Sequence, residues 1–249
     1  MQKEVKKSWA LFLGIGTMMI AHGLQMQIMG IRSVLEQFSI FTTGIFMSGY
    51  YVGYFIGSKT TPNLVQKVGH IRVFAAFASL ASLSALVAVA YVNPLMWTIS
   101  RFITGISLVS CYVVAESWLN DRATNKNRGQ LLSAYMMVIY FGLAVGMLLL
   151  NVSEPKAYEP FILVSVLLSL ALVPILLIKR PAPKFKKIGT ISIKELFNIS
   201  PLGSVSSFFT GVIHAAFFSL ISVYATAANF KLFETSILLF VATIAGVLF

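Results

Sequence analysis

Long apolar segments dominate the sequence, and each is long enough to cross a lipid bilayer as an α-helix. The hydrocarbon core of a bilayer is about 30 Å thick, and about eight segments here approach the ~20 apolar residues that a spanning helix needs. They cover residues 9–31, 41–58, 73–92, 95–119, 130–152, 160–178, 204–228 and 232–249. Irregular backbone cannot face lipid, because its polar groups would lack partners. The sequence therefore predicts an all-α membrane protein.

The composition excludes a soluble globular enzyme. Hydrophobic residues make up 57% of the 249 residues and charged residues 11%, whereas soluble domains hold about 25% charged residues. The single cysteine, Cys111, rules out a disulfide within the chain and a cysteine metal cluster. The connections are too short for a catalytic domain, and they contain no phosphate loop, catalytic triad or metal-ligand spacing. We expect no enzyme activity, metal or cofactor.

Basic residues gather in alternate connections between the apolar segments. The formal net charge is +11, with 19 Lys and Arg residues. If the N-terminus is cytoplasmic, most of these residues fall on the cytoplasmic side, as the positive-inside rule requires. The outside connections contain only Arg32, Lys156 and Lys231. We therefore expect a cytoplasmic N-terminus, and we attribute the basic charge to membrane topology and not to nucleic-acid binding.

The longest connection divides the chain into three parts. Residues 1–178 are expected to form a six-helix bundle, residues 179–203 a basic cytoplasmic linker, and residues 204–249 the first two helices of a second bundle. Within the linker, Ser192 and Glu195 match a capping box that precedes apolar residues at helical spacing. This pattern predicts a short amphipathic helix on the inner leaflet, with Lys186, Lys187 and Lys194 near anionic headgroups.

Glycines recur at a spacing of four residues in two of the segments. Gly49, Gly53 and Gly57 lie in the second segment, and Gly142 and Gly146 lie in the fifth. Small residues at this spacing form one face of a helix, where another backbone can approach closely. The pattern predicts two tight helix–helix contacts.

Arg101 is the one basic residue inside an apolar segment. Ionisable residues at membrane depth are costly, so each is a functional hypothesis. Its long side chain could instead extend to the outer interface. Gly105, one turn away, allows another helix or a ligand to come close, and this favours the functional interpretation.

Other polar residues interrupt the apolar segments. His22 and Gln25 share a face of the first helix, and Gln27 lies off that face. His22 could titrate near neutral pH or could be a neutral packing residue, and His214 in the seventh segment poses the same question. Tyr50, in the second segment, offers a hydroxyl group and an aromatic wall.

Glu116 lies at the inner end of the fourth segment, close to further charges. Asp121 and Arg122 follow it, and Arg128 begins the fifth segment. Glu116 could form an ion pair that ties the helix ends together, or it could carry a proton. Its shallow depth favours the ion pair.

Several short motifs resemble those of the major facilitator superfamily. Residues 62–72 are similar to the loop signature Gly-x-Leu-x-Asp-Arg-x-Gly-Arg through Leu64, Lys67, Gly69 and Arg72. Residues 101–105 resemble the Arg-x-x-x-Gly motif of the fourth helix, and the Glu116 region resembles the glutamate and Arg-Gly pair of the second inner loop.

A bacterial subgroup, the YcaD-like transporters, is a closer match. The stretches 69–74 (GHIRVF) and 116–120 (ESWLN) look much like that subgroup. Two positions of the loop signature differ, because Pro62 and Gln66 stand where the superfamily has Gly and Asp. Any gating role of that aspartate does not carry over to this chain.

The resemblance implies a secondary transporter with its substrate site near mid-membrane, between two bundles of six helices. It implies a small solute moved by alternating access across the bacterial inner membrane, with proton coupling. The candidate residues for the substrate and proton pathway are His22, Gln25, Tyr50, Arg101 and His214. The candidate residues for an inner-loop charge network are Lys67, Gly69, Arg72, Glu116, Asp121, Arg122 and Arg128. The alternative hypothesis is a truncated, transport-inactive remnant, because the second run of segments stops after two.

Overall fold

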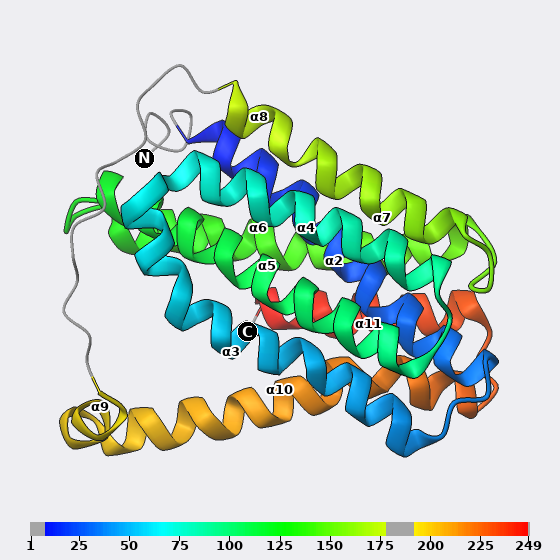
Figure 1. Cartoon of the computed structure of the whole chain (residues 1–249). Coiled ribbons are helices and arrows are strands. Elements are labelled where there is room, and N and C mark those ends of the chain that lie inside the picture. The colour runs from blue at the N-terminus through cyan, green and yellow to red at the C-terminus, as the bar shows by residue number, and fades with distance from the viewer. Residues whose placement is uncertain (1–7, 178–191, 249) are drawn as a thin grey trace.

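The computed structural model describes residues 8–177 and 192–248, and in these ranges it consists of helices joined by short connections (Figure 1). The helices are α2 (Trp9–Leu35), α3 (Ile40–Val68), α4 (His70–Ala90), α5 (Pro94–Arg122), α6 (Arg128–Leu148), the 3-10 turn η1 (Leu149–Val152), α7 (Glu159–Leu170), α8 (Leu172–Leu176), α9 (Ile193–Ile199), α10 (Pro201–Ala227) and α11 (Leu232–Leu248). We call α2 to α8 the first bundle.

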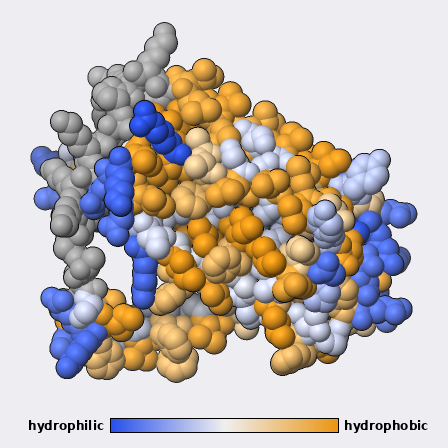
Figure 2. Space-filling model, in the orientation of Figure 1, coloured by the Kyte–Doolittle hydropathy of each residue, from blue (hydrophilic) through white to orange (hydrophobic). Residues whose placement is uncertain are grey.

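Most of the long helices have the length and composition of membrane spans. Six of the described spans qualify: α2, α4, α5, α6 with η1, α7 with α8, and α10. The apolar helix α11 is shorter, at 17 residues. The helix α3 has 29 residues, but its glycines, tyrosines and threonines lower its mean hydropathy. Figure 2 shows hydrophobic residues over the middle of the visible face and hydrophilic residues at its two ends. The protein is an all-α integral membrane protein.

Local sequence signals set several helix starts. The Ser39 hydroxyl accepts a hydrogen bond from the Thr42 amide, and the Asn93 side chain accepts one from the Met96 amide. Such side chains satisfy backbone N–H groups that have no partner within the helix. Ser192 caps α9 in the same way by accepting from the Glu195 amide at 3.1 Å. The expected short helix is therefore present, and none of its residues is buried. Lys186 and Lys187 lie outside the described residues.

The expected loop between the second and third segments is mostly helical. We expected residues 62–72 to form a loop, but α3 continues to Val68 with Pro62 inside it, and α4 begins at His70. Polar residues do not by themselves end a helix outside the membrane core, because a helix with polar side chains is as compatible with water as a loop is. Gly69 makes the break, with a φ of +87° that favours glycine.

Two glycine-lined contacts hold the first bundle together, as the spacing predicted. A Cβ atom added at Gly49 would lie 3.0 Å from the Thr98 carbonyl oxygen, and one at Gly53 would overlap the Phe102 carbonyl. From the other side, Gly105 of α5 lies against the backbone of Tyr50. Gly142 and Gly146 of α6 approach α2 in the same manner. The backbones in these contacts touch, so a side chain added there would force the helices apart.

The helices α10 and α11 pack on α2 and α6 (Figure 1). The buried residues of α10 all lie near its C-terminal end, at Ser219, Ser222, Val223 and Ala225. Its N-terminal half is exposed, as Leu202 and Phe208 illustrate. The helix α2 is 72% buried over its most apolar window, against 22% for α10. The helix α2 is therefore the centre of the fold, and α10 leans on it with one end.

Candidate functional site

A cavity of about 720 Å³ lies between α10 and the first bundle, within the size range of small-molecule sites. Its aromatic and apolar lining comprises Met26, Tyr50, Tyr51, Tyr54, Tyr112, Met136, Ile139, Tyr140, Leu143, Met147, Ala215 and Phe218. Its remaining lining comprises His22, Glu116, Ser206, Ser207, Thr210, Gly211 and His214. These residues come from α2, α3, α5, α6 and α10, so the cavity depends on the contact between α10 and the first bundle.

Side-chain contacts between α10 and the first bundle close one end of the cavity. The Tyr51 hydroxyl lies 3.1 Å from the Ser219 hydroxyl and donates to the Ala215 carbonyl at 3.3 Å. Gln27 donates to the Phe218 carbonyl at 3.4 Å. Further along, Gly30 lies directly against Ser222. The sequence placed Gln27 off the face of α2 that holds His22 and Gln25. The structure shows that the Gln27 side chain contacts α10.

The other end of the cavity is open. Its deep lining residues, such as His22 and Tyr50, are only 6% exposed. Glu116, Ser206 and Ser207 lie in the exposed class. This gradient shows that the cavity opens at the end where α5 finishes and α10 begins.

Tyr50 connects two of the expected site residues. The His22 ring stacks on the Tyr50 ring with centroids 5.3 Å apart, and His22 Nε2 lies 3.5 Å from the Tyr50 hydroxyl. The Arg101 guanidinium carbon lies 4.7 Å from the centroid of the Tyr50 ring. Cations are attracted to the face of an aromatic ring at this distance. Three residues from α2, α3 and α5 thus form one cluster at the deep end of the cavity.

Arg101 does not extend to the membrane interface. Its side chain is fully buried, with a relative exposure of 0%. In the described part of the chain, none of its three guanidinium nitrogens has a hydrogen-bond partner. Arg101 is not itself a lining residue, and it lies directly behind Tyr50.

The other two expected pathway residues have different surroundings. His214 lines the cavity and lies against Phe218, with ring centroids 4.4 Å apart. Gln25 donates to Thr104 at 3.5 Å, and Thr104 also pairs with Ser84 at 2.8 Å. Gln25 therefore belongs to a buried polar contact between α2 and α5, away from the cavity wall.

The structure brings the expected charge network to one end of the first bundle. Lys67 lies in the last turn of α3, Gly69 in the turn and Arg72 in the first turn of α4. Asp121 and Arg122 end α5, and Arg128 begins α6. Arg122 donates to the Ser8 hydroxyl at 3.3 Å. Glu116 differs from the rest because it lines the cavity. Its ion pair with a basic neighbour stays a prediction.

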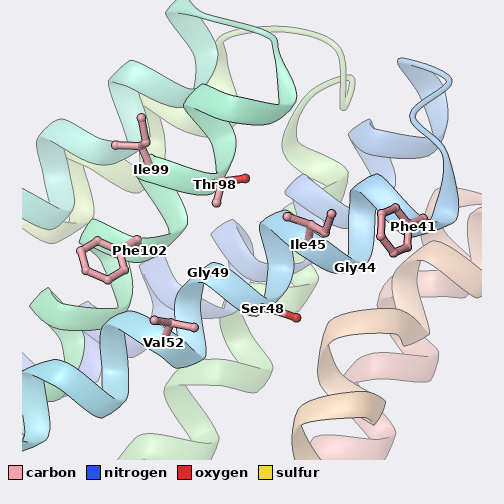
Figure 3. Close-up of a pocket in the computed structure, with 9 residues that line it drawn as sticks. All are labelled: Phe41, Gly44, Ile45, Ser48, Gly49, Val52, Thr98, Ile99 and Phe102. Atoms are coloured by element: carbon pink, nitrogen blue, oxygen red, sulfur yellow. The ribbon is translucent and has the colours of Figure 1, made fainter.

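A second hollow lies on the outer side of α3 and α5. It has a volume of about 710 Å³ and is lined by Phe41, Gly44, Ile45, Ser48, Gly49, Val52, Thr98, Ile99 and Phe102 (Figure 3). None of these side chains is charged or titratable. This second hollow can therefore accommodate an apolar chain, but its lining contains no group that could select a solute.

The sequence alone missed several residues of the site. It did not select Tyr51, whose hydroxyl joins α3 to α10, or the lining residues Tyr112, Tyr140 and Thr210. Aromatic and small hydroxyl residues are common in membrane helices as packing groups. Their spacing does not tell which of them face a cavity.

The sequence matches the Major Facilitator Superfamily over residues 11–249. The chain belongs to this superfamily. It is 25% identical over 191 residues to the uncharacterized MFS-type transporter YcaD of Escherichia fergusonii, which covers 76% of this chain and 50% of that protein. It is 30% identical over 141 residues to an uncharacterized MFS-type transporter of Yersinia pestis, which covers 57% and 37% of the two chains. The chain spans about half the length, or less, of these relatives.

A solved structure shares the fold. The crystal structure of a D-xylose-proton symporter aligns with a TM-score of 0.64 and 13% sequence identity, covering 96% of this chain and 66% of that one. At this identity the likeness shows the fold alone. The family match confirms the expected resemblance to the superfamily, and the shared fold agrees with it.

Proposed function

We propose that the protein moves a small solute across the bacterial inner membrane by alternating access, coupled to protons. The observation that carries this proposal is the cavity between α10 and the first bundle, with polar contacts across one end and exposed lining residues at the other. Transporters of this class bind their substrate between two bundles that rock against each other. The name of the D-xylose-proton symporter, which shares the fold, supports both the solute and the proton.

The proposal assigns roles to the three parts of the chain. Residues 1–178 form one rocking body, residues 204–249 begin the other, and residues 179–203 connect them on the cytoplasmic side. The N-terminus is cytoplasmic, so the open end faces the cytoplasm. Outward opening separates Tyr51 from Ser219 and brings Ser206 toward Glu116.

The proposed proton carriers are the titratable groups on the cavity wall. His22 lies at the deep end, His214 on α10 and Glu116 at the open end. Each can exchange a proton in the state that exposes it. The solute and the proton then bind in the same cavity. Binding of one therefore changes the binding of the other, as coupling requires.

Cysteine labelling tests alternating access directly. Cys111 is the only cysteine of the sequence and is buried, so a Cys111→Ser background leaves one new thiol to label. Ser206→Cys reports on the open end and Ser222→Cys on the closed end. In the proposed cycle, a membrane-impermeant reagent labels Ser206→Cys from the cytoplasm and Ser222→Cys slowly from outside. The transported solute should raise the labelling rate at one of these two positions and lower it at the other.

Two controls fix the sides in the same experiment. Ser192→Cys marks the expected cytoplasmic side and Lys156→Cys the expected outside, and both positions are exposed. Labelling of these two markers from the opposite sides would reverse the orientation. Labelling of Ser206→Cys and Ser222→Cys that never responds to solute, with no solute-driven proton flux in proteoliposomes, would favour the transport-inactive remnant.

A further inference from the structure

We propose that the solute is an organic monoanion with an apolar body, and that Arg101 binds its carboxylate. This inference rests on the proposed transport function and adds a substrate class to it. It starts from a cation that the described part of the protein leaves without a counter-ion.

Arg101 is buried, and no group among the described residues balances its charge. Arginine stays protonated and carries five N–H donors. A buried charge without a partner is strongly unfavourable. Among the described residues, the three guanidinium nitrogens lack a hydrogen-bond partner. An ionisable residue inside a membrane helix commonly marks a substrate or ion pathway, so it is a functional-site hypothesis by default.

No described carboxylate takes the role of partner. Glu36 pairs with Arg32 at 3.3 Å, within α2. Glu116 lies on α5 itself, about 22 Å further along the helix axis at about 1.5 Å per residue. What Arg101 contacts instead is the face of Tyr50, at 4.7 Å. An aromatic face attracts a cation but does not accept its N–H groups as a carboxylate does.

The Tyr50 side chain lies between Arg101 and the cavity. Tyr50 lines the cavity and contacts both His22 and Arg101. A turn of the Tyr50 ring about its side-chain bonds would therefore open the guanidinium group to the solute. The planar guanidinium can then bind a carboxylate through two parallel hydrogen bonds, which is the geometry that arginine offers and lysine does not.

The rest of the cavity fits the remainder of such a solute. Around the deep cluster the walls are largely aromatic and aliphatic, with Tyr112, Leu143 and Phe218 among them. Glu116 at the open end is the one acidic lining residue. A carboxylate there disfavours a second negative charge on the solute, because like charges repel at short range. Arg101 disfavours a cation at the deep end. The combination selects a single negative charge on an apolar body.

Three matched probes test the substrate class. Benzoate, benzyl alcohol and benzylamine share a ring and differ in charge. We expect the full-length protein in detergent to bind benzoate at least about tenfold more tightly than either of the other two, which is about 1.4 kcal/mol. Titration calorimetry or intrinsic fluorescence gives the three dissociation constants. Equal affinities, or a preference for benzylamine, would overturn the inference.

Variants test the role of Arg101. We expect Arg101→Gln to weaken benzoate binding by at least about tenfold and to leave benzyl alcohol binding unchanged, because a charged hydrogen-bond pair is lost. Arg101→Lys should recover part of the loss. Arg32→Gln removes another buried arginine, outside the cavity, and should leave benzoate binding unchanged. Wild-type benzoate affinity in folded Arg101→Gln would sink the assignment. If that variant does not fold, the three-probe comparison on the wild type and Arg101→Lys still decides.

The outcomes separate the substrate class from transport itself. If the cysteines report alternating access but benzoate has no advantage, the transport proposal stands and the monoanion is wrong. If Arg101 binds benzoate while accessibility never changes and no flux occurs, the binding site stands and transport is wrong. If a carboxylate outside the described residues already pairs with Arg101, Arg101→Gln should lose stability and should keep the wild-type preference for benzoate.

Discussion

Between α3 and α5 the two backbones touch, whereas between α10 and the first bundle side chains meet across a cavity. The first contact runs along Gly49, Gly53 and Gly105 and leaves no room for another atom. The second has a few long hydrogen bonds, such as that from Tyr51 to Ala215 at 3.3 Å, and it leaves half of α10 exposed. The difference teaches which surface can move, because tight backbone packing resists sliding and sparse polar contacts can exchange. The predictions below test this contrast from the largest effect to the smallest.

The glycine contact gives the largest expected effect. Gly53→Ala places a Cβ atom into the Phe102 carbonyl, so we expect a loss of about 3 kcal/mol or failure to fold, as in other overpacked contacts. Gly44→Ala, on the same helix, meets nothing within 4 Å and should be neutral or slightly stabilising. Thermal unfolding in detergent compares the pair. Equal melting temperatures would show that the α3–α5 contact is not rigid.

Arg101→Met tests whether a residue between α3 and α5 is kept for binding at a cost in stability. Removing a buried charge without a partner should raise the free energy of unfolding by about 1–3 kcal/mol. Benzoate binding should be lost in the same variant. Chemical or thermal unfolding measures the first effect and calorimetry the second. A large loss of stability would indicate that another part of the protein already balances this charge.

Tyr51→Phe weakens the movable contact alone. It removes a hydroxyl that bonds both Ala215 and Ser219, which contributes about 1 kcal/mol. The closed end should then open more often, and Ser222→Cys should label about fivefold faster from outside. Tyr54→Phe is the matched control, because Tyr54 lines the cavity without such a bond to α10. Identical labelling rates in both variants would mean that this contact does not hold the cavity closed.

The smallest effect is expected at the helix caps. Ser39→Ala removes the exposed cap of α3, a helix that packs along α5, and should cost about 0.5–1 kcal/mol of stability. Ser192→Ala removes the same type of cap from α9, which buries no residue, so the melting temperature should stay the same. Hydrogen exchange of residues 193–199 should increase instead. A shifted melting temperature would show that α9 is packed more firmly than its exposure indicates.

The sequence alone was sufficient to predict the helices, since the length of an apolar run is a local property. The glycine contacts were predictable for the same reason, because four-residue spacing fixes one face of one helix. The turn at Gly69 was not, because polar residues are compatible with both a loop and an extended helix. The site was found in part. His22, Tyr50 and Arg101 stood out as polar groups in apolar surroundings.

The partners of those groups could not be predicted. Gln25 and Gln27 are equally polar and two residues apart, yet one contacts α5 and the other contacts α10. The periodicity of a helix gives the direction of a side chain but not the identity of the neighbour in that direction. That identity depends on how all the helices pack.

The central position of α2 has a consequence for biosynthesis. The ribosome makes α2 before the other described helices, so the partners that bury it come later. Gln27 and the Phe218 carbonyl are 191 residues apart in sequence. At about 5–20 residues per second, the ribosome needs roughly 10–40 seconds to produce the second after the first. During that interval Gln27 lacks its α10 partner, whereas the partners of His22 and Gln25 are made only 28 and 79 residues after them. The helix at the centre of the fold therefore completes its polar contacts only when α10 arrives.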